Sequence, residues 1–395
     1  MISFDEAVEL VRSVGSPLGT ETVPVAQAAG RVLAGRVLAQ IDSPRTDVSA
    51  MDGYAVRGAD LARLPASLQI VAESFAGRGW SGAVAPGVCV RIFTGAPLPA
   101  GADRVVIQEN VRRDRDRAII DEYPGGALHI RKRGSDFSAG EELLSAGRLL
   151  DARSIVAAAA ADTAELDVYR RPRLHILGTG DELAEPGTAR QHPDAIPESV
   201  SFGVAAMAEQ WGGECIGRTR LPDDLPRMQR AAETAIESAD LVVVTGGASV
   251  GEKDFAKAMF EPLGLELVFS KVAIKPGKPV WLGRVRGKLV MGLPGNPTSA
   301  LVTARLLLAP LLTGLTGQPV ERALRWRTEP LESPLDACGA RETFHRARTV
   351  NGKAAILSFQ DSSAQKALAQ ADLLVRQHAN SPALAAGAEA GVLDF

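Results

Sequence analysis

The sequence predicts a mixed α/β protein of several domains: a three-layer α/β domain with a mainly parallel sheet, an inserted β unit, a helical linker region and a C-terminal β domain. Three observations lead to this prediction. The 395 residues exceed what one ordinary core holds. Residues 43–123 carry short Val- and Ile-rich runs between glycines and prolines, which is typical of short strands. From Arg173 onward, apolar strands alternate with helical stretches, which favours a parallel sheet.

The first half of the chain predicts an elongated helical region interrupted by the β unit. Residues 1–42 and 124–171 are assigned to the elongated region, and residues 43–123 to the inserted unit, with strands in LQIVAE, VCVRIF, DRVVIQ and RAIID. Apolar periodicity predicts helices in the elongated region at residues 4–14, 24–38 and 152–161.

The second half predicts the α/β domain over residues 172–317 and the C-terminal β domain over residues 318–395. Buried strands are expected in LHILGTG, ECIGRTRL, DLVVVTGG, LELVFSKVAI, PVWLGRV and KLVMGLPG. Helices are expected at residues 199–211, 225–238, 255–263 and 298–315. The C-terminal runs ALRWRT, ETFHRART, AAILSF and LLVRQ predict short strands.

Composition excludes several classes of protein. A net charge of −3 argues against a nucleic-acid binder. The cysteines Cys89, Cys215 and Cys338 are distant in sequence and odd in number, so neither a disulfide framework nor a zinc motif is expected. The acidic, amphipathic start MISFDEAVELV is unlike a signal peptide, and we expect no membrane span. A cytoplasmic protein is the simplest prediction.

Polar or glycine-rich turns follow three of the predicted strands. Ligands of open α/β sheets bind where parallel strands end, so these turns predict one site at one sheet edge. Glycines let backbone N–H groups approach a phosphate closely, and prolines fix the turn at a helix start. The candidates are Gly178, Gly180, Asp181 and Glu182 in LGTGDEL; Gly246, Gly247, Ser249 and Asp254 in TGGASVGEKD; and Pro294, Gly295 and Asn296 in LPGNPTSA.

A lysine-rich segment, KVAIKPGKPV, adds the cations Lys271, Lys275 and Lys278. Lysines neutralise oxyanions, and carboxylates hold magnesium, so the combination suits a magnesium-assisted nucleotide site. Each signal also has a structural interpretation: a turn, a solvated strand end, or a helix cap at Asp254. Neither the GK[ST] phosphate loop nor the dinucleotide glycine fingerprint is present. The convergence of the glycine turns, acids and lysines on one sheet edge favours the functional interpretation.

Seven motifs together resemble the molybdopterin molybdenumtransferase family, which includes bacterial MoeA and the E domain of gephyrin. In the order and spacing of that family, they are SAMDGYAV, IFTGAPLPAGAD, RKRGSDF, GTGDEL, VTGGASVGEKD, IKPGKP and GLPGNP. The resemblance covers essentially the whole chain. It implies transfer of molybdenum from molybdate to adenylylated molybdopterin, with release of AMP and a requirement for Mg²⁺. It further implies a homodimer whose active site lies between the α/β domain of one subunit and the β unit of the other.

The resemblance also implies roles for individual residues. Positions matching residues implicated in activity are Asp52, Thr94, Glu182, Asp223 and Asp254, and Glu182 and Asp254 suit a metal. Lys275 and Lys278 would hold molybdate, and Gly246, Gly247 and Ser249 would cradle the pterin or phosphate. The remaining substrate-side positions are Lys271, Pro294, Gly295, Asn296, Ser299, Arg346 and Ser362. The pterin adenylyltransferase and molybdenum-enzyme chaperones are the further partners that this function suggests.

The chain departs from the family pattern at three places. IPESVSF has Pro197 and Val200 where an aromatic residue and an asparagine are usual, and Thr46 stands where an aromatic is common. QDSS has Asp361 and Ser363 in place of two glycines. Two alternatives to the insertase therefore stay open: a diverged paralogue that binds the pterin nucleotide or acts as a scaffold, and a pterin adenylyltransferase.

Overall fold

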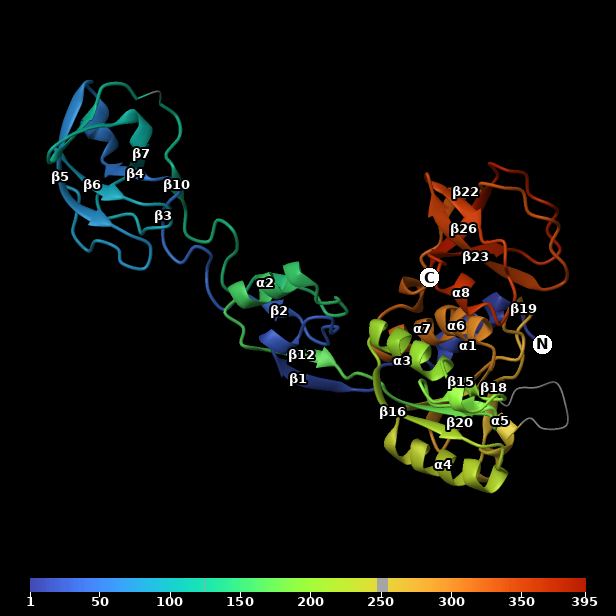
Figure 1. Cartoon of the computed structure of the whole chain (residues 1–395). Coiled ribbons are helices and arrows are strands. Elements are labelled where there is room, and N and C mark those ends of the chain that lie inside the picture. The colour runs from blue at the N-terminus through green and yellow to red at the C-terminus, as the bar shows by residue number, and fades with distance from the viewer. Residues whose placement is uncertain (124, 247–254) are drawn as a thin grey trace.

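The computed structural model describes residues 1–123, 125–246 and 255–395. Figure 1 shows an extended molecule, with the inserted β unit at one end and an elongated region in the middle. The α/β unit and the C-terminal β unit lie together at the other end. The mixed α/β architecture predicted from the sequence is confirmed. Because the inserted β unit lies far from the α/β unit, candidate site residues in these two units form separate groups.

The inserted β unit is built on a six-stranded sheet in the order β7-β4-β6-β5-β9-β8. Burial alternates along β5, whose inward residues Ala66 and Leu68 join a core with Tyr54, Val56 and Val106. This period of two is what one covered sheet face requires. The strands are β4 (Gly53–Val56), β5 (Ala66–Ser74), β6 (Val88–Ile92), β7 (Arg104–Ile107), β8 (Arg112–Asp114) and β9 (Arg117–Ile120), with β3 (Val48–Ser49) and β10 (Ile130–Arg131) paired separately.

The elongated region contains two small antiparallel pairs and one helix. β1 (Thr20–Pro24) pairs with β12 (Glu165–Tyr169), and β2 (Val37–Leu38) pairs with β11 (Glu142–Leu144). α2 (Ala152–Ala160) begins after Asp151, whose side chain accepts a hydrogen bond from the amide of Ser154 at 2.9 Å.

The predicted helix over residues 24–38 is wrong. Only a 3-10 turn, η1 (Val25–Gln27), forms there. Gly30 has a φ of +74°, which is outside the helical range. The amides of Gly30 and Leu33 bond to the carbonyls of Leu150 and Arg148, both at 2.9 Å. Pairing with the returning chain therefore replaces the local hydrogen bonds of a helix.

The first helix, α1 (Phe4–Val14), packs against the α/β unit although residues 1–42 were assigned to the elongated region. Ser3 and Glu6 form a reciprocal capping box at its start. Its buried residues Phe4, Ala7 and Val11 share one core with Leu311 and Leu312. The apolar stripe of α1 is therefore covered by the α/β unit.

The α/β unit has a six-stranded sheet in the order β16-β13-β17-β21-β20-β18. The first four strands are mutually parallel, and the last two are antiparallel to their neighbours. The strands are β13 (Arg173–Thr179), β16 (Glu214–Leu221), β17 (Leu241–Thr245), β18 (Glu266–Phe269), β20 (Trp281–Val285) and β21 (Lys288–Leu293), and a short pair is formed by β14 (Leu183–Ala184) and β15 (Ile196–Pro197).

Helices cover both faces of this sheet and complete the three layers. One core unites the sheet with α1, α3 (Val200–Gln210), α6 (Pro297–Thr303) and α7 (Ala309–Leu315), and the other unites it with α4 (Leu225–Ser238) and α5 (Phe255–Ala258). A π-helical turn, Ala304–Leu308, joins α6 to α7. The predicted helix over residues 255–263 is shorter and ends in a 3-10 turn, η5 (Glu261–Leu263).

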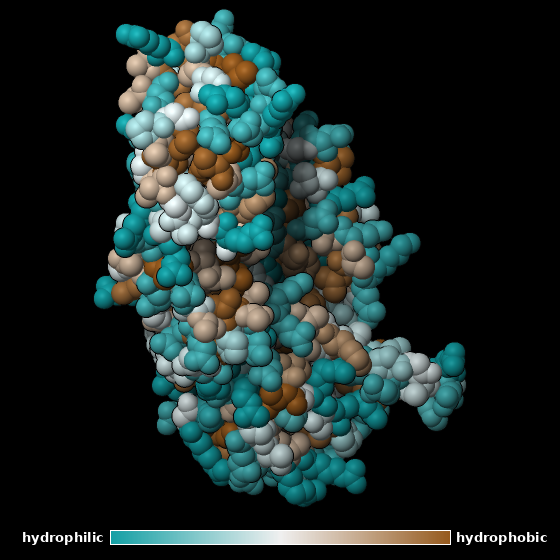
Figure 2. Space-filling view, turned by 90° about the vertical axis from the view of Figure 1, so that its left-hand side faces the viewer, coloured by the Kyte–Doolittle hydropathy of each residue, from teal (hydrophilic) through white to brown (hydrophobic). Residues whose placement is uncertain are grey.

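Within the described residues, one helix, Pro297–Leu315, has the length and apolarity of a membrane span. Its 18-residue window is 94% buried inside the protein. Its apolar character is therefore explained by its place in the core. The molecular face in Figure 2 mixes hydrophilic and hydrophobic residues.

The C-terminal β unit has a sheet in the order β19-β23-β25-β26-β22, with β24 paired to β23. Its elements are β22 (Arg327–Pro330), β23 (Glu342–Val350), β24 (Lys353–Ile356), α8 (Gln365–Leu368), β25 (Leu373–Gln377) and β26 (Glu389–Asp394). β19 (Ile274–Lys275) comes from the lysine-rich segment, which was expected to extend a strand of the α/β sheet. This segment therefore bridges the two units.

Candidate functional site

Three strand ends meet at the edge of the parallel sheet. Gly246 follows β17 with a φ of +89°, and a Cβ there would lie 2.5 Å from the carbonyl oxygen of Thr179, at the end of β13. A Cβ on Gly295, after β21, would lie 3.2 Å from the Cα of Gly246. Only glycine allows this approach at position 246. Because Gly246 and Gly295 have no side chains, the three turns can approach one another this closely.

These turns line a cavity of about 760 Å³, hereafter the main cavity. Its walls come from the ends of β13, β17 and β21, from the starts of α3 and α6, and from the loop before α8. Among the predicted site residues, it gathers Glu182, Asp223, Gly246, Pro294, Gly295, Asn296 and Ser299. Residues from four separate turns thus lie around one cavity of the size that binds a small molecule.

Three predicted residues, Gly247, Ser249 and Asp254, lie outside the described residues. Their neighbours Gly246 and Phe255 both line the main cavity. The described residues on both sides of this segment therefore lie at the main cavity.

A loop of the C-terminal β unit closes the main cavity on one side. The amide nitrogen Nδ2 of Asn296 donates to Oγ of Ser362 at 3.0 Å, and the backbone amide of Thr298 donates to the carbonyl of Ser362 at 3.1 Å. Asp361 accepts hydrogen bonds from both the amide and the hydroxyl of Ser363, at 2.8 and 2.6 Å. The aspartate therefore stabilises the turn in this QDSS variant.

Arg346 on β23 is fully buried in the same unit. Its Nη2 donates to the carbonyl of Phe359 at 3.3 Å, whereas Nε and Nη1 have no hydrogen-bond partner in the described part of the chain. Burial lowers the pKa of this guanidinium. A buried cation with free donors is a strong attractor for an oxyanion.

The three lysines are exposed at the junction of the two units. Lys275 lines a second cavity of about 590 Å³, together with His345 and Cys338. Lys278 precedes Pro279, which lines the main cavity. None of the three lysines lines the main cavity, and Lys278 comes nearest to it in sequence, next to Pro279.

Glu198 was not selected from the sequence, but it lines the main cavity with only 5% of its surface exposed. Its carboxylate accepts the amide of Ser201 at 2.8 Å and the hydroxyl of Ser201 at 2.5 Å. The sequence signal that could have identified Glu198 is an acidic residue three positions before a serine at the start of a predicted helix. Glu198 thus accepts one of the first amide groups of α3, so this helix start already has a negative partner.

Asp52 and Thr94 form a separate pair at the edge of the inserted β unit. The amide and the hydroxyl of Thr94 both donate to Oδ1 of Asp52, each at 2.7 Å. These bonds, the amide first, hold the pKa of Asp52 below its ordinary value. Figure 1 shows the inserted β unit at the opposite end of the molecule from the α/β unit. Within one copy, the structure does not bring this pair to the main cavity.

The main cavity has a donor set that fits a magnesium ion shared with a substrate. No group of three His, Cys, Asp or Glu side chains suited to a metal occurs among the described residues. Two carboxylates, Glu182 and Asp223, line the cavity. Mg²⁺ is commonly held by one or two carboxylates, water and substrate phosphate, so a protein-only cage is not required.

Residues 2–161 match the family model described as the MoeA N-terminal region (domain I and II). The probable molybdopterin binding domain matches residues 175–314. A molybdopterin molybdenumtransferase of Haemophilus influenzae is 38% identical, over 88% of this chain and 84% of its own length. One of Synechococcus elongatus is 32% identical over 98% of both chains.

Solved structures give the same result. Two structures of the molybdopterin biosynthesis moeA protein of Pyrococcus horikoshii have TM-scores of 0.84 and cover all of this chain, at 29% and 26% identity. The fold and the cavity at its strand ends thus define a multidomain enzyme of molybdenum-cofactor biosynthesis. The chain belongs to the molybdopterin molybdenumtransferase family.

Proposed function

We propose that this protein transfers molybdenum from molybdate to adenylylated molybdopterin, releasing AMP and forming molybdenum cofactor. The observation that carries the proposal is the main cavity, where glycine-rich strand ends meet acids and Asn296 under a loop of the C-terminal unit. The names of the full-length relatives support the same reaction.

The glycine turns suit the phosphate end of the substrate. Gly246 and Gly295 expose backbone groups where no side chain intervenes. Asn296, at the start of α6, adds a carboxamide. The substrate would then lie across the sheet edge, with its phosphates over the strand ends.

Molybdate, a dianion, suits the cationic side chains at the junction of the α/β unit and the C-terminal β unit. Lys275 and Lys278 supply point charges, and Arg346, with its free donors, supplies a third positive charge that is buried. Ser299 lines the cavity and Ser362 bonds to Asn296, so both hydroxyl groups are assigned to molybdate, and Lys271 is assigned with the other two lysines.

Glu182 and Asp223 would hold Mg²⁺ together with the phosphate groups, and Asp254 is the further acid proposed for this role. When bound, the ion would neutralise phosphate oxygens and stabilise the departing AMP. Glu198 is not assigned to the metal, because its oxygens already bond to Ser201.

We propose a homodimer as the active form, because Asp52 and Thr94 lie far from the main cavity of their own chain. A two-fold dimer would bring this pair of one copy to the cavity of the other, and each would complete the partner's site. The proposed setting is the cytoplasm, with the pterin adenylyltransferase and molybdenum-enzyme chaperones as supplier and recipients.

The test separates insertion from the alternatives. Purified protein is given either adenylylated molybdopterin with molybdate and Mg²⁺, or molybdopterin with ATP and Mg²⁺. The proposal expects reactivation of a molybdenum-free apo-enzyme in the first reaction and no pyrophosphate in the second. Pyrophosphate in the second would identify an adenylyltransferase. Tight nucleotide binding without turnover in either would identify a binding protein.

A further inference from the structure

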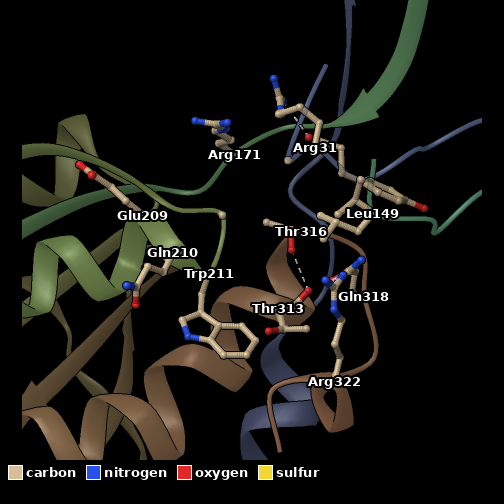
Figure 3. Close-up of a pocket in the computed structure, with 14 residues that line it drawn as sticks. Arg31, Leu149, Arg171, Glu209, Gln210, Trp211, Thr313, Thr316, Gln318 and Arg322 are labelled. Atoms are coloured by element: carbon tan, nitrogen blue, oxygen red, sulfur yellow. Dashed lines mark hydrogen bonds between the residues drawn. The ribbon is translucent and has the colours of Figure 1, made fainter. Parts of the chain in front are cut away.

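A third cavity lies at the junction between the elongated region and the α/β unit. This junction cavity has a volume of about 420 Å³ (Figure 3). Leu149 and Tyr169 come from the elongated region, and Trp211 and Thr313 come from the ends of α3 and α7. None of its lining residues belongs to the main cavity.

The lining of the junction cavity is predominantly positive. It contains three guanidinium groups, those of Arg31, Arg171 and Arg322, and one carboxylate, that of Glu209. Arg31 is paired with Glu21, outside the cavity lining. The exposed guanidinium of Arg171 has no partner among the described residues. The cavity therefore has an excess of positive charge that its own residues do not neutralise.

Arg322 adds to this excess. Its Nη1 donates to the neutral Oε1 of Gln318, and no carboxylate of the described residues pairs with it. Burial, together with the neighbouring Arg325, lowers the pKa of Arg322. An anion in the cavity would relieve this unfavourable burial of charge.

These arginines are not needed to cap the helices that end here. The last carbonyls of α7, those of Leu312, Thr313 and Gly314, accept the amides of residues 316–318 at 3.0 Å. At the end of α3, the carbonyl of Ala208 accepts the amide of Gly213 at 2.8 Å, and the carbonyl of Glu209 accepts the amide of Gly212 at 3.1 Å. The helix ends are thus satisfied by backbone groups, as a closed C-terminus requires.

One wall of the junction cavity is aromatic. The half-buried indole of Trp211 lines it, with Arg305 4.8 Å from the ring centroid. Figure 3 shows Trp211 below Arg171 and across from Arg322, so the aromatic surface and both guanidinium groups face one cavity. An aromatic surface beside cations suits a ring that bears a negative charge.

We propose that the junction cavity is a regulatory site for a small organic anion, a phosphate or carboxylate carried on a flat ring. Two helices connect it to the main cavity. α3 runs from Ser199 and Val200, at the main cavity, to Trp211. The continuous helix Pro297–Leu315 runs from Pro297, at the main cavity, to Thr313. A ligand at the junction thus contacts the far ends of both helices.

Phenyl phosphate is the probe, titrated into the full chain by calorimetry, with benzoate and inorganic phosphate as the comparison anions. The expected result is saturable binding that weakens at least tenfold in Arg171→Ser, because a charge-assisted hydrogen bond is lost. Arg171 is exposed, so this variant is expected to fold. Arg322→Gln should weaken binding similarly. Tighter binding of phenyl phosphate than benzoate would identify phosphate as the preferred anion, and the reverse a carboxylate.

Two matched variants make the test specific. Arg230→Ser removes an exposed arginine of α4 and should leave binding unchanged. Asn296→Ala, in the main cavity, should also leave it unchanged, so the test does not depend on the proposed reaction. Unaltered binding in both Arg171→Ser and Arg322→Gln, loss of binding in Asn296→Ala, or no saturable binding would overturn the proposal.

Amide hydrogen exchange tests whether a ligand in the junction cavity affects the main cavity. Phenyl phosphate should slow amide hydrogen exchange at residues 208–212 and 313–318, and also at residues 200–203 and 298–301 beside the main cavity. Slowed exchange confined to the junction residues would contradict transmission along the two helices.

Discussion

The side chain of Asn296 donates a hydrogen bond to Oγ of Ser362 at 3.0 Å, across the border between the α/β unit and the C-terminal β unit. This contact fixes the loop that closes the main cavity. Because the two residues are 66 positions apart, the cavity wall depends on how the two units pack against each other.

Asn296→Ala and Ser362→Ala test this contact as a pair. Each single change should lower the free energy of unfolding by about 0.5–1.5 kcal/mol. Each should also reduce molybdenum insertion by at least about tenfold, because the cavity wall loosens. The double variant should be little worse than either single variant, as measured by a double-mutant cycle. Fully additive losses would mean that the two residues act independently.

Arg346→Met tests the buried guanidinium. The charge has no described ion-pair partner, so its removal should leave the free energy of unfolding unchanged or raise it by about 1 kcal/mol. Molybdate should raise the melting temperature of the unchanged protein but not that of the variant, as followed by differential scanning fluorimetry. An equal molybdate shift in both proteins would remove Arg346 from the oxyanion site.

Gly246→Ala tests the close approach of the strand ends. Both Gly246 and Gly264 have positive φ, so alanine at either should cost about 1–2 kcal/mol of folding stability. A Cβ at 264 meets nothing within 4 Å, whereas one at 246 meets the Thr179 carbonyl at 2.5 Å. Gly246→Ala should therefore cost at least about 1 kcal/mol more in denaturant unfolding. Equal costs would show that the turn relaxes freely.

Thr94→Val tests the electrostatics of the pair in the inserted unit. The pKa of Asp52 is lowered in the folded state, so its stabilising effect is present above the unfolded pKa of about 3.9 and is lost as pH falls through the folded value. The variant loses the hydroxyl but keeps the amide, so the pKa of Asp52 should rise part of the way to its ordinary value. Carboxyl-carbon NMR titration measures this, and an unchanged pKa would contradict the role of the hydroxyl.

Mixing two inactive variants tests the composite site. Asp52→Asn and Glu182→Gln should each abolish insertion, whereas random exchange of subunits between them should restore about a quarter of the activity of the unchanged protein. The restored sites would combine the intact pair of one chain with the intact cavity of the other. No recovery, once mass spectrometry has confirmed heterodimers, would show that both residues act within one copy.

Local pattern predicted much of the fold. The sequence specified α1 and α4 because their apolar residues repeat at helical spacing and their starts carry caps. It failed at residues 24–38, where pairing with residues 148–150 overrides a weak helical pattern. It missed β26 and the pairing of β19 with β23, because both depend on partners distant in sequence.

The candidate site was likewise predictable where it depends on local pattern and unpredictable where it depends on distant contacts. The convergence of the glycine turns was predictable, since ends of parallel strands share one edge. Glu198 and the Asn296–Ser362 bond were not, because burial and contacts between units leave no spacing pattern. Asp52 and Thr94 were selected by family resemblance alone, and their 2.7 Å hydrogen bonds were not predicted.

The most direct test of the central claim is release of AMP from adenylylated molybdopterin as molybdate is varied, with Mg²⁺ present. The account predicts AMP release that requires molybdate, saturates with it, and is lost in Glu182→Gln while that variant keeps its melting temperature. AMP release at the same rate without molybdate, or undiminished in Glu182→Gln, would contradict molybdenum insertion at the main cavity.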